Sequence, residues 1–175
     1  MAHSIELLLD AGSEAAVRTQ WQALADVGLP SQLRVKSPTN RPHITLLAAR
    51  EIDPAVDDVL RALGPRFPFG CVLGAPVLFG GPRLTLARLV VPSAELLSLH
   101  EEIYRLSLPH VSGDPYPHCA PGHWTAHATL GRRFTTAEIG AALAVVGSGA
   151  GEIAAQVSGL RRWDPDRRVD HLLVG

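Results

Sequence analysis

The sequence predicts an α+β fold built as a bilobal pseudo-twofold duplication, with two small antiparallel sheets that flank a cleft and helices outside. Two observations predict this fold. The pattern His-x-Thr occurs at His43 and again at His127, 84 positions later. When the two halves are superimposed at this separation, they show the same predicted order of strands and helices. We therefore expect the 175 residues to form a single domain with internal lobes of about 1–82 and 83–175.

Each half is predicted to run strand, helix, strand, helix, strand. In the first half, short apolar runs predict the strands and runs of helix-forming residues predict the helices. Ser13 and Glu14 suit the start of the first helix and Gly28 follows its end, while Gly64-Pro65 closes the second helix. The predicted elements are 4–10, 13–27, 41–48, 54–63 and 69–79.

The same order begins again at Leu84, after the break that Gly80-Gly81-Pro82 makes in the chain. Ser93 is a favourable N-cap and predicts a helix that starts there. The predicted elements of this half are 84–91, 93–106, 124–131 and 136–146, followed by extended segments at 152–163 and 168–174.

Composition limits the partners that the chain can have. The 46% of apolar residues suffices for a buried core, and 16 basic residues nearly balance 17 acidic ones. No global basic field favours a long nucleic acid, so an anionic ligand needs a local site. Residues 1–10 lack the pattern of a signal peptide, and no stretch reaches the roughly 20 apolar residues of a membrane span. We expect a cytoplasmic monomer that does not contact a membrane, and free thiols at Cys71 and Cys119.

The two His-x-Thr motifs predict one shared site. Side chains at i and i+2 of a strand point to the same face, so His43 lies beside Thr45 and His127 beside Thr129. The residues between and beside them, such as Ile44 and Ala128, are apolar or small and suit the core face of a sheet. If the two strands are twofold mates, the four polar side chains converge.

These residue types are suited to chemistry at phosphorus. Imidazole titrates near neutrality, so one histidine can act as a general base while the other acts as a general acid. Threonine hydroxyls can donate hydrogen bonds to the non-bridging oxygens of a phosphate. This chemistry requires no metal, no cofactor and no covalent intermediate.

The segments PHITLL and AHATLG, together with their spacing and the repeat, resemble the 2H phosphoesterase superfamily. Within it they are similar to the 2′-5′ RNA ligase-like proteins and the RNA 2′,3′-cyclic phosphodiesterases. The resemblance implies a metal-independent phosphodiesterase that opens 2′,3′-cyclic phosphates, or cleaves or forms 2′-5′ linkages, at RNA or nucleotide ends. It assigns acid/base catalysis to His43 and His127, and phosphate binding to Thr45, Thr129 and Arg132.

The function of the cleft and the roles of two aromatic residues each have an alternative interpretation. A non-catalytic module that binds a nucleotide or RNA end could use the same cleft, although binding alone does not require two titratable groups. Tyr116 and Trp124 are candidates for stacking on a base, while Trp124 is equally suited to the core or to the interface between the lobes.

Other polar clusters have simpler interpretations. The residues His118, Cys119, His123 and His127 are zinc-ligand types. His123 and His127 have the i, i+4 spacing of a helix, but 124–131 is predicted to be a strand, so their rings would not share a face. His100, His110 and His171 are expected to be structural. The basic residues around the last turn are expected to be a solvated hairpin end rather than an RNA-binding patch; they are Arg161, Arg162, Arg167 and Arg168.

Overall fold

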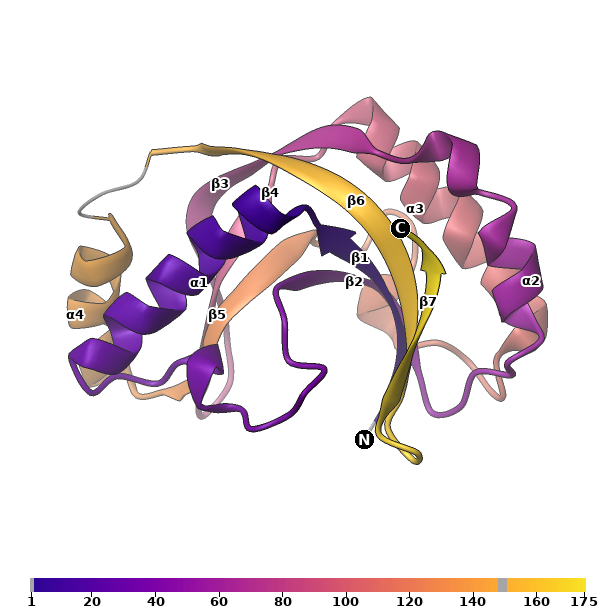
Figure 1. Ribbon diagram of the computed structural model, residues 1–175. Helices are drawn as coiled ribbons and strands as arrows, with labels where there is room; N and C mark the ends of the chain where they lie inside the picture. The colour runs from indigo at the N-terminus through magenta and orange to yellow at the C-terminus, as the bar shows by residue number, and fades with distance from the viewer. Residues whose placement is uncertain (1, 148–150) are drawn as a thin grey trace.

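The strands of the protein form one antiparallel sheet with helices on both sides (Figure 1). The structure is a computed structural model that describes residues 2–147 and 151–175. Its strands are β1 (His3–Leu9), β2 (His43–Ala49), β3 (Phe69–Phe79), β4 (Leu84–Val90), β5 (His127–Phe134), β6 (Ile153–Asp164) and β7 (Val169–Val174). Its α-helices are α1 (Ala11–Asp26), α2 (Val56–Arg61), α3 (Ala94–Ser107) and α4 (Thr136–Gly147).

The predicted α+β class and the predicted order of elements are confirmed, since β-α-β-α-β occurs twice before β7. The sequence predicts two small sheets, but the strands form one continuous sheet in the order β1-β2-β5-β4-β3-β6-β7, with a further pairing of β1 with β6. The long strand β6 joins the two halves. It pairs with β3 along Ile153–Val157 and with β1 along Val157–Trp163.

The register of the sheet fits the predicted twofold relation. Strands β2 and β5 meet at one pair of residues, Ile44 and Ala128, and β3 meets β6 with Cys71 opposite Ala155. The members of each pair are 84 positions apart, which is also the separation of His43 and His127. A twofold axis that relates the halves would pass through both pairs.

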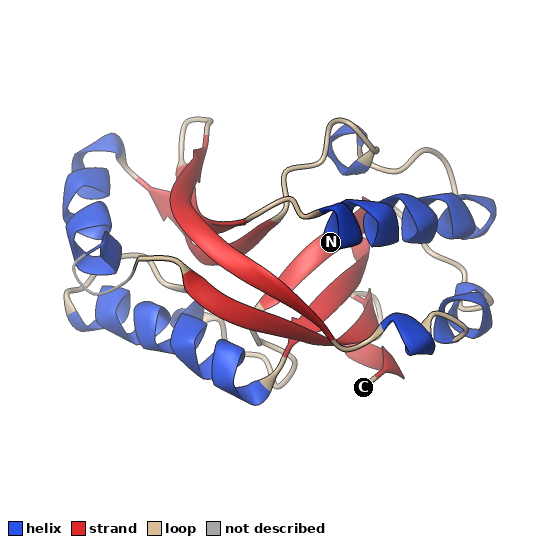
Figure 2. Cartoon of the chain, turned by 90° about the horizontal axis from the view of Figure 1, so that it is seen from above, coloured by secondary structure: helices blue, strands red, loops and turns tan. Residues whose placement is uncertain are grey.

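The α-helices pack in two pairs, and each pair combines one helix from each half of the chain. Helix α1 packs with α4 and contacts β5, whereas α3 packs with α2 and contacts β2. Figure 2 shows the helices in two groups on opposite sides of the strands. Each His-x-Thr strand is therefore supported by a helix from the other half of the chain. None of the described helices has the length and apolarity to cross a membrane.

Two element boundaries differ from the sequence prediction. Helix α1 begins at Ala11 rather than Ser13, because the side chain of Asp10 accepts a hydrogen bond from the Ser13 amide and caps the helix. Strand β5 begins at His127 rather than Trp124, whose ring instead stacks on His100 at a centroid distance of 3.9 Å.

The prediction of a solvated hairpin end is wrong for Arg161 and Arg162, which are only 3% and 1% exposed. Neighbouring strand residues point to opposite faces, and each guanidinium finds a carboxylate on its own side. Arg161 pairs with Glu6 at 2.8 Å, and Arg162 binds both oxygens of Asp57 at 2.6 and 2.8 Å. Hydrogen bonds to Asp57 raise the pKa of Arg162, against the effect of burial.

Replacing Gly131 with alanine is expected to lower the free energy of unfolding by about 1–3 kcal/mol, the usual cost of overpacking. An added Cβ would collide with the main-chain oxygen of Pro30 and the ring of Phe134. Gly140 on α4 is the matched control, because an added Cβ there meets open space and alanine favours the helix. Denaturant titration of both variants measures the difference, and equal unfolding free energies would contradict the packing argument.

Candidate active site

The pairing of β2 with β5 places the two motifs against each other. Ile44 and Ala128 are opposite one another and fully buried. Because side chains alternate along a strand and opposite residues share a face, the residues on both sides of this pair point to the other face. His43 therefore lies across from Thr129, and Thr45 lies across from His127. The register brings these four side chains to one face of the sheet.

Both catalytic candidates are fixed in the same tautomer. The Nδ1 atom of His43 lies 2.8 Å from the main-chain oxygen of Arg41, and that of His127 lies 2.7 Å from the oxygen of Thr125. A carbonyl oxygen only accepts, so Nδ1 carries the hydrogen in each ring. The Nε2 atom of each neutral imidazole is left with a lone pair, which is the form that a general base requires.

Two tryptophans hold the strands where they separate. Beyond Ile44 and Ala128 the strands no longer pair, and the threonine carbonyls need other donors. The indole of Trp21 donates to the oxygen of Thr129 at 3.0 Å, and that of Trp124 donates to the oxygen of Thr45 at 2.9 Å. Each indole comes from the opposite half of the chain.

His100 extends this support. Its Nε2 atom lies 3.2 Å from the oxygen of Leu46 and 2.9 Å from that of Cys119, so it donates to both. Burial lowers the pKa of His100, which favours a neutral ring, and the two carbonyls place its hydrogen on Nε2. The histidine therefore has the structural role that the sequence suggested, and its stacking on Trp124 fixes that indole.

The charges around His127 favour its neutral form. Burial lowers the pKa of His127, and the positive charges of Arg132, His43 and His118 act in the same direction against the carbonyl of Thr125. Arg132 shares the face of Thr129, because their partners on β4, Thr85 and Ala87, are two positions apart.

Two residues outside the motifs lie beside the histidines, and the remaining candidate Tyr116 lies at the surface. Tyr116 is 42% exposed and its ring lies 5.9 Å from that of His118. The ring of Phe79 lies 4.4 Å from His127, and the carboxylate of Glu6 lies 3.7 Å from His43. Phe79 and Glu6 belong to apolar strand segments and carry no local motif, so only their register shows that they belong to the site.

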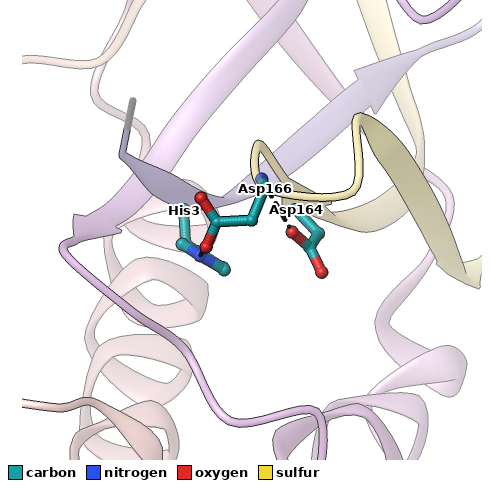
Figure 3. Close-up of side chains that lie close together, drawn as sticks. All are labelled: His3, Asp164 and Asp166. Atoms are coloured by element: carbon teal, nitrogen blue, oxygen red, sulfur yellow. Dashed lines mark hydrogen bonds and ion pairs between the residues drawn. The ribbon is translucent and has the colours of Figure 1, made fainter.

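One group in the described part of the chain has metal-ligand character, and it lies at the β6–β7 turn (Figure 3). Its members are His3, Asp164 and Asp166, whose ligand atoms lie within 4.8 Å of one another. Their protein contacts explain the cluster. His3 pairs with Asp166 at 3.1 Å, and Asp164 accepts from the amides of Asp166 and Arg167. His118, Cys119 and His123 do not form such a group among the described residues.

The two cysteines are free, as predicted, and both are buried. Burial raises the pKa of Cys71 to about 11 and also raises that of Cys119. Both thiols are protonated at neutral pH and are therefore poor nucleophiles.

The fold is that of the two-histidine phosphoesterases. A family model of the 2′-5′ RNA ligase superfamily matches residues 13–168, and the chain belongs to this superfamily. Usb1 of Kluyveromyces marxianus is similar in structure, with a TM-score of 0.58, 10% identity and coverage of 98% of this chain and 97% of Usb1. E. coli LigT complexed with 3′-AMP gives a TM-score of 0.55 and 14% identity over 98% of this chain and 92% of LigT.

A second structure of K. marxianus Usb1 contains uridine monophosphate and gives a TM-score of 0.55 and 10% identity over 98% of this chain and 96% of Usb1. Comparison with curated proteins yields no match.

The imidazole of His127 is expected to titrate below the ordinary histidine value of about 6.5, because burial and Arg132 both disfavour its charged form. The variant Arg132→Gln removes one of these effects and should move the midpoint to higher pH. Measurement by ¹H–¹⁵N NMR on the imidazole tests this, with the exposed Arg133→Gln as the neighbouring control. A midpoint that does not respond to Arg132 would contradict the placement of its charge at the site.

Proposed function

We propose that the protein is a metal-independent phosphodiesterase that opens 2′,3′-cyclic phosphates, or cleaves or forms 2′-5′ linkages, at RNA or nucleotide ends. The observation that carries the proposal is the pairing of Ile44 with Ala128, which sets two imidazoles and two threonines on one face. Membership of the superfamily and the nucleotides bound by Usb1 and LigT support a nucleotide or RNA end as the ligand.

In the proposed reaction, a water molecule attacks the phosphorus of the cyclic phosphate. The Nε2 atom of His127 accepts a proton from this water, and the bond between phosphorus and one ribose oxygen breaks. The protonated Nε2 of His43 donates its hydrogen to that oxygen, which leaves as a hydroxyl. The product is a phosphomonoester, and a proton has moved from one imidazole to the other.

Three further residues are proposed to hold the phosphate. The hydroxyls of Thr45 and Thr129 donate to its non-bridging oxygens, where negative charge develops in the transition state. Arg132 adds a positive charge on the same face. Tyr116 is exposed and available for stacking on a base, whereas one face of the Trp124 ring already contacts His100.

Replacing either His43 or His127 with alanine is expected to lower turnover by about two to four decades, the usual value of one proton-transfer group. The wild-type rate should follow a bell-shaped pH profile, and the double variant should lose much less than the product of the single effects. A panel of 2′,3′-cyclic nucleotides and 2′-5′ dinucleotides provides the substrates.

Two outcomes would count against this mechanism. Activity that is lost on chelation and restored by zinc would indicate metal catalysis. Binding of the nucleotide without turnover would instead support the non-catalytic module.

Replacing Thr45 or Thr129 with valine should lower the rate by about 10- to 1000-fold, the order associated with loss of one donor to a developing oxyanion. Valine keeps the shape and leaves both imidazoles in place, so the effect should be smaller than that of either histidine variant. Steady-state kinetics measure it, with Thr19→Val on the exposed side of α1 as the control. Losses equal to those of the histidine variants would show that the threonines do more than hold the phosphate.

A further inference from the structure

The two halves of the candidate site differ in one position next to the histidines. In the β1–β2 ladder, Leu7 lies opposite Ile44, and Glu6 lies opposite Thr45. In the β4–β5 ladder, Arg88 lies opposite Ala128, and Ala87 lies opposite Thr129. Since Ile44 and Ala128 are twofold mates, Glu6 and Ala87 occupy equivalent places. His43 has a carboxylate beside it, and His127 has a methyl group in the corresponding place.

The strands that neighbour β1 and β4 show the same difference between a charged and an apolar side chain. Arg161 of β6 lies opposite Glu6, and Val77 of β3 lies opposite Ala87. Arg161 and Val77 are again 84 positions apart. A buried ion pair beside one histidine thus corresponds to two apolar side chains beside the other, and the site has different electrostatics on its two sides.

Glu6 is held firmly in an ionised state. It is 4% exposed, and its Oε1 atom accepts a hydrogen bond from the Ser4 hydroxyl at 2.6 Å. The Nε and Nη2 atoms of Arg161 each lie 2.8 Å from its Oε2 atom. Burial by itself would raise the pKa of Glu6, but the charges of His43 and Arg161 and the Ser4 hydrogen bond together lower it.

On the Glu6 side of His43, the ionised side chains carry a net negative charge, which a protonated His43 balances. Arg161 also donates to the carboxylate of Asp170 on β7 at 2.9 Å and to the main-chain oxygen of Thr39 at 3.0 Å. Glu6, Asp170 and Arg161 together carry one net negative charge. A positive charge on the imidazole of His43 makes the group neutral.

The distance between Glu6 and His43 leaves the proton on His43 Nε2 available for transfer to a substrate. Glu6 Oε1 lies 3.7 Å from His43 Nε2, which is close enough for an ion pair but too long for a hydrogen bond. Because Nδ1 is occupied by the Arg41 carbonyl, Nε2 is the atom that can give up a proton. The carboxylate stabilises the imidazolium without accepting its hydrogen, which remains free to point at a substrate oxygen.

We propose that Glu6, fixed by Arg161, is a positioning residue that keeps His43 protonated at Nε2 and thereby makes it the general acid. His127, which has Ala87 in the equivalent place, is left as the general base. The assignment rests on the proposed function, and it explains how a twofold scaffold gives two similar histidines different roles. It also predicts the proton transfer that each histidine makes: His43 donates a proton to the departing ribose oxygen, and His127 accepts a proton from the attacking water.

Glu6→Gln tests the proposal, because it keeps the shape of the side chain and removes its charge. The alkaline limb of the kcat/KM pH profile should move to lower pH by about one unit, with about a tenfold loss of turnover above neutrality, while the acidic limb stays in place. Glu6→Asp, which retains the charge, should restore most of the alkaline limb. A substrate with sulfur in place of the departing oxygen should remove most of the difference, because a thiolate leaves with little need of a proton.

Asp57→Asn is the matched control for loss of a buried ion pair. Asp57 binds Arg162, the neighbour of Arg161 that points to the opposite face of β6. This variant should lower stability without moving either limb of the pH profile. An unmoved alkaline limb in Glu6→Gln, or a shift of the acidic limb in its place, would overturn the assignment.

A measurement without substrate separates this inference from the proposed function. The ¹⁵N signal of His43 Nε2, measured by NMR at neutral pH, should move toward that of an unprotonated ring nitrogen in Glu6→Gln, because the adjacent negative charge has been removed. Such a change in a protein that turns over no phosphodiester would uphold the role of Glu6 and refute the proposed function. An unchanged signal would overturn the inference whatever the turnover.

Discussion

The pairing of Ile44 with Ala128 is the contact on which the site depends. It is the one point of register between β2 and β5 in the described part of the sheet, and it sends the four motif side chains to the same face. A slip of one residue in either strand would turn its histidine and threonine into the core, because the side-chain period of a strand is two. The geometry of the site is therefore a property of the sheet.

So short a contact leaves main-chain oxygens on both strands without partners in the ladder, and side chains from other elements donate to them. Trp21 binds the carbonyl of Thr129, Trp124 that of Thr45, and His100 that of Leu46. The donors for each strand come from the other half of the chain, as do the helices that contact them, α1 against β5 and α3 against β2. The halves interlock through the site, so neither motif is supported by its own half alone.

The pairing of β2 with β5 places the two imidazoles in similar main-chain surroundings, and charge makes them different. The hydrogen bonds from Nδ1 to the oxygens of Arg41 and Thr125 are the same on both sides. Around them, the side of His43 carries Glu6 and Arg161, whereas the side of His127 carries Ala87, Val77 and, further along β5, Arg132. Acid/base catalysis needs one protonated and one neutral group, and this distribution of charge provides a physical reason for such a division.

The sequence by itself determined the order of helices and strands and the two motifs 84 positions apart, because apolar periodicity, caps and glycine or proline breaks act over a few residues. Tertiary structure decided what lies between distant segments. Only the ladders show that β6 joins the halves, that Arg161 is buried against Glu6, and that Trp21 reaches Thr129. These partners are separated by 155 and 108 residues along the chain. No local pattern encodes such contacts, since register and burial depend on how the whole sheet assembles.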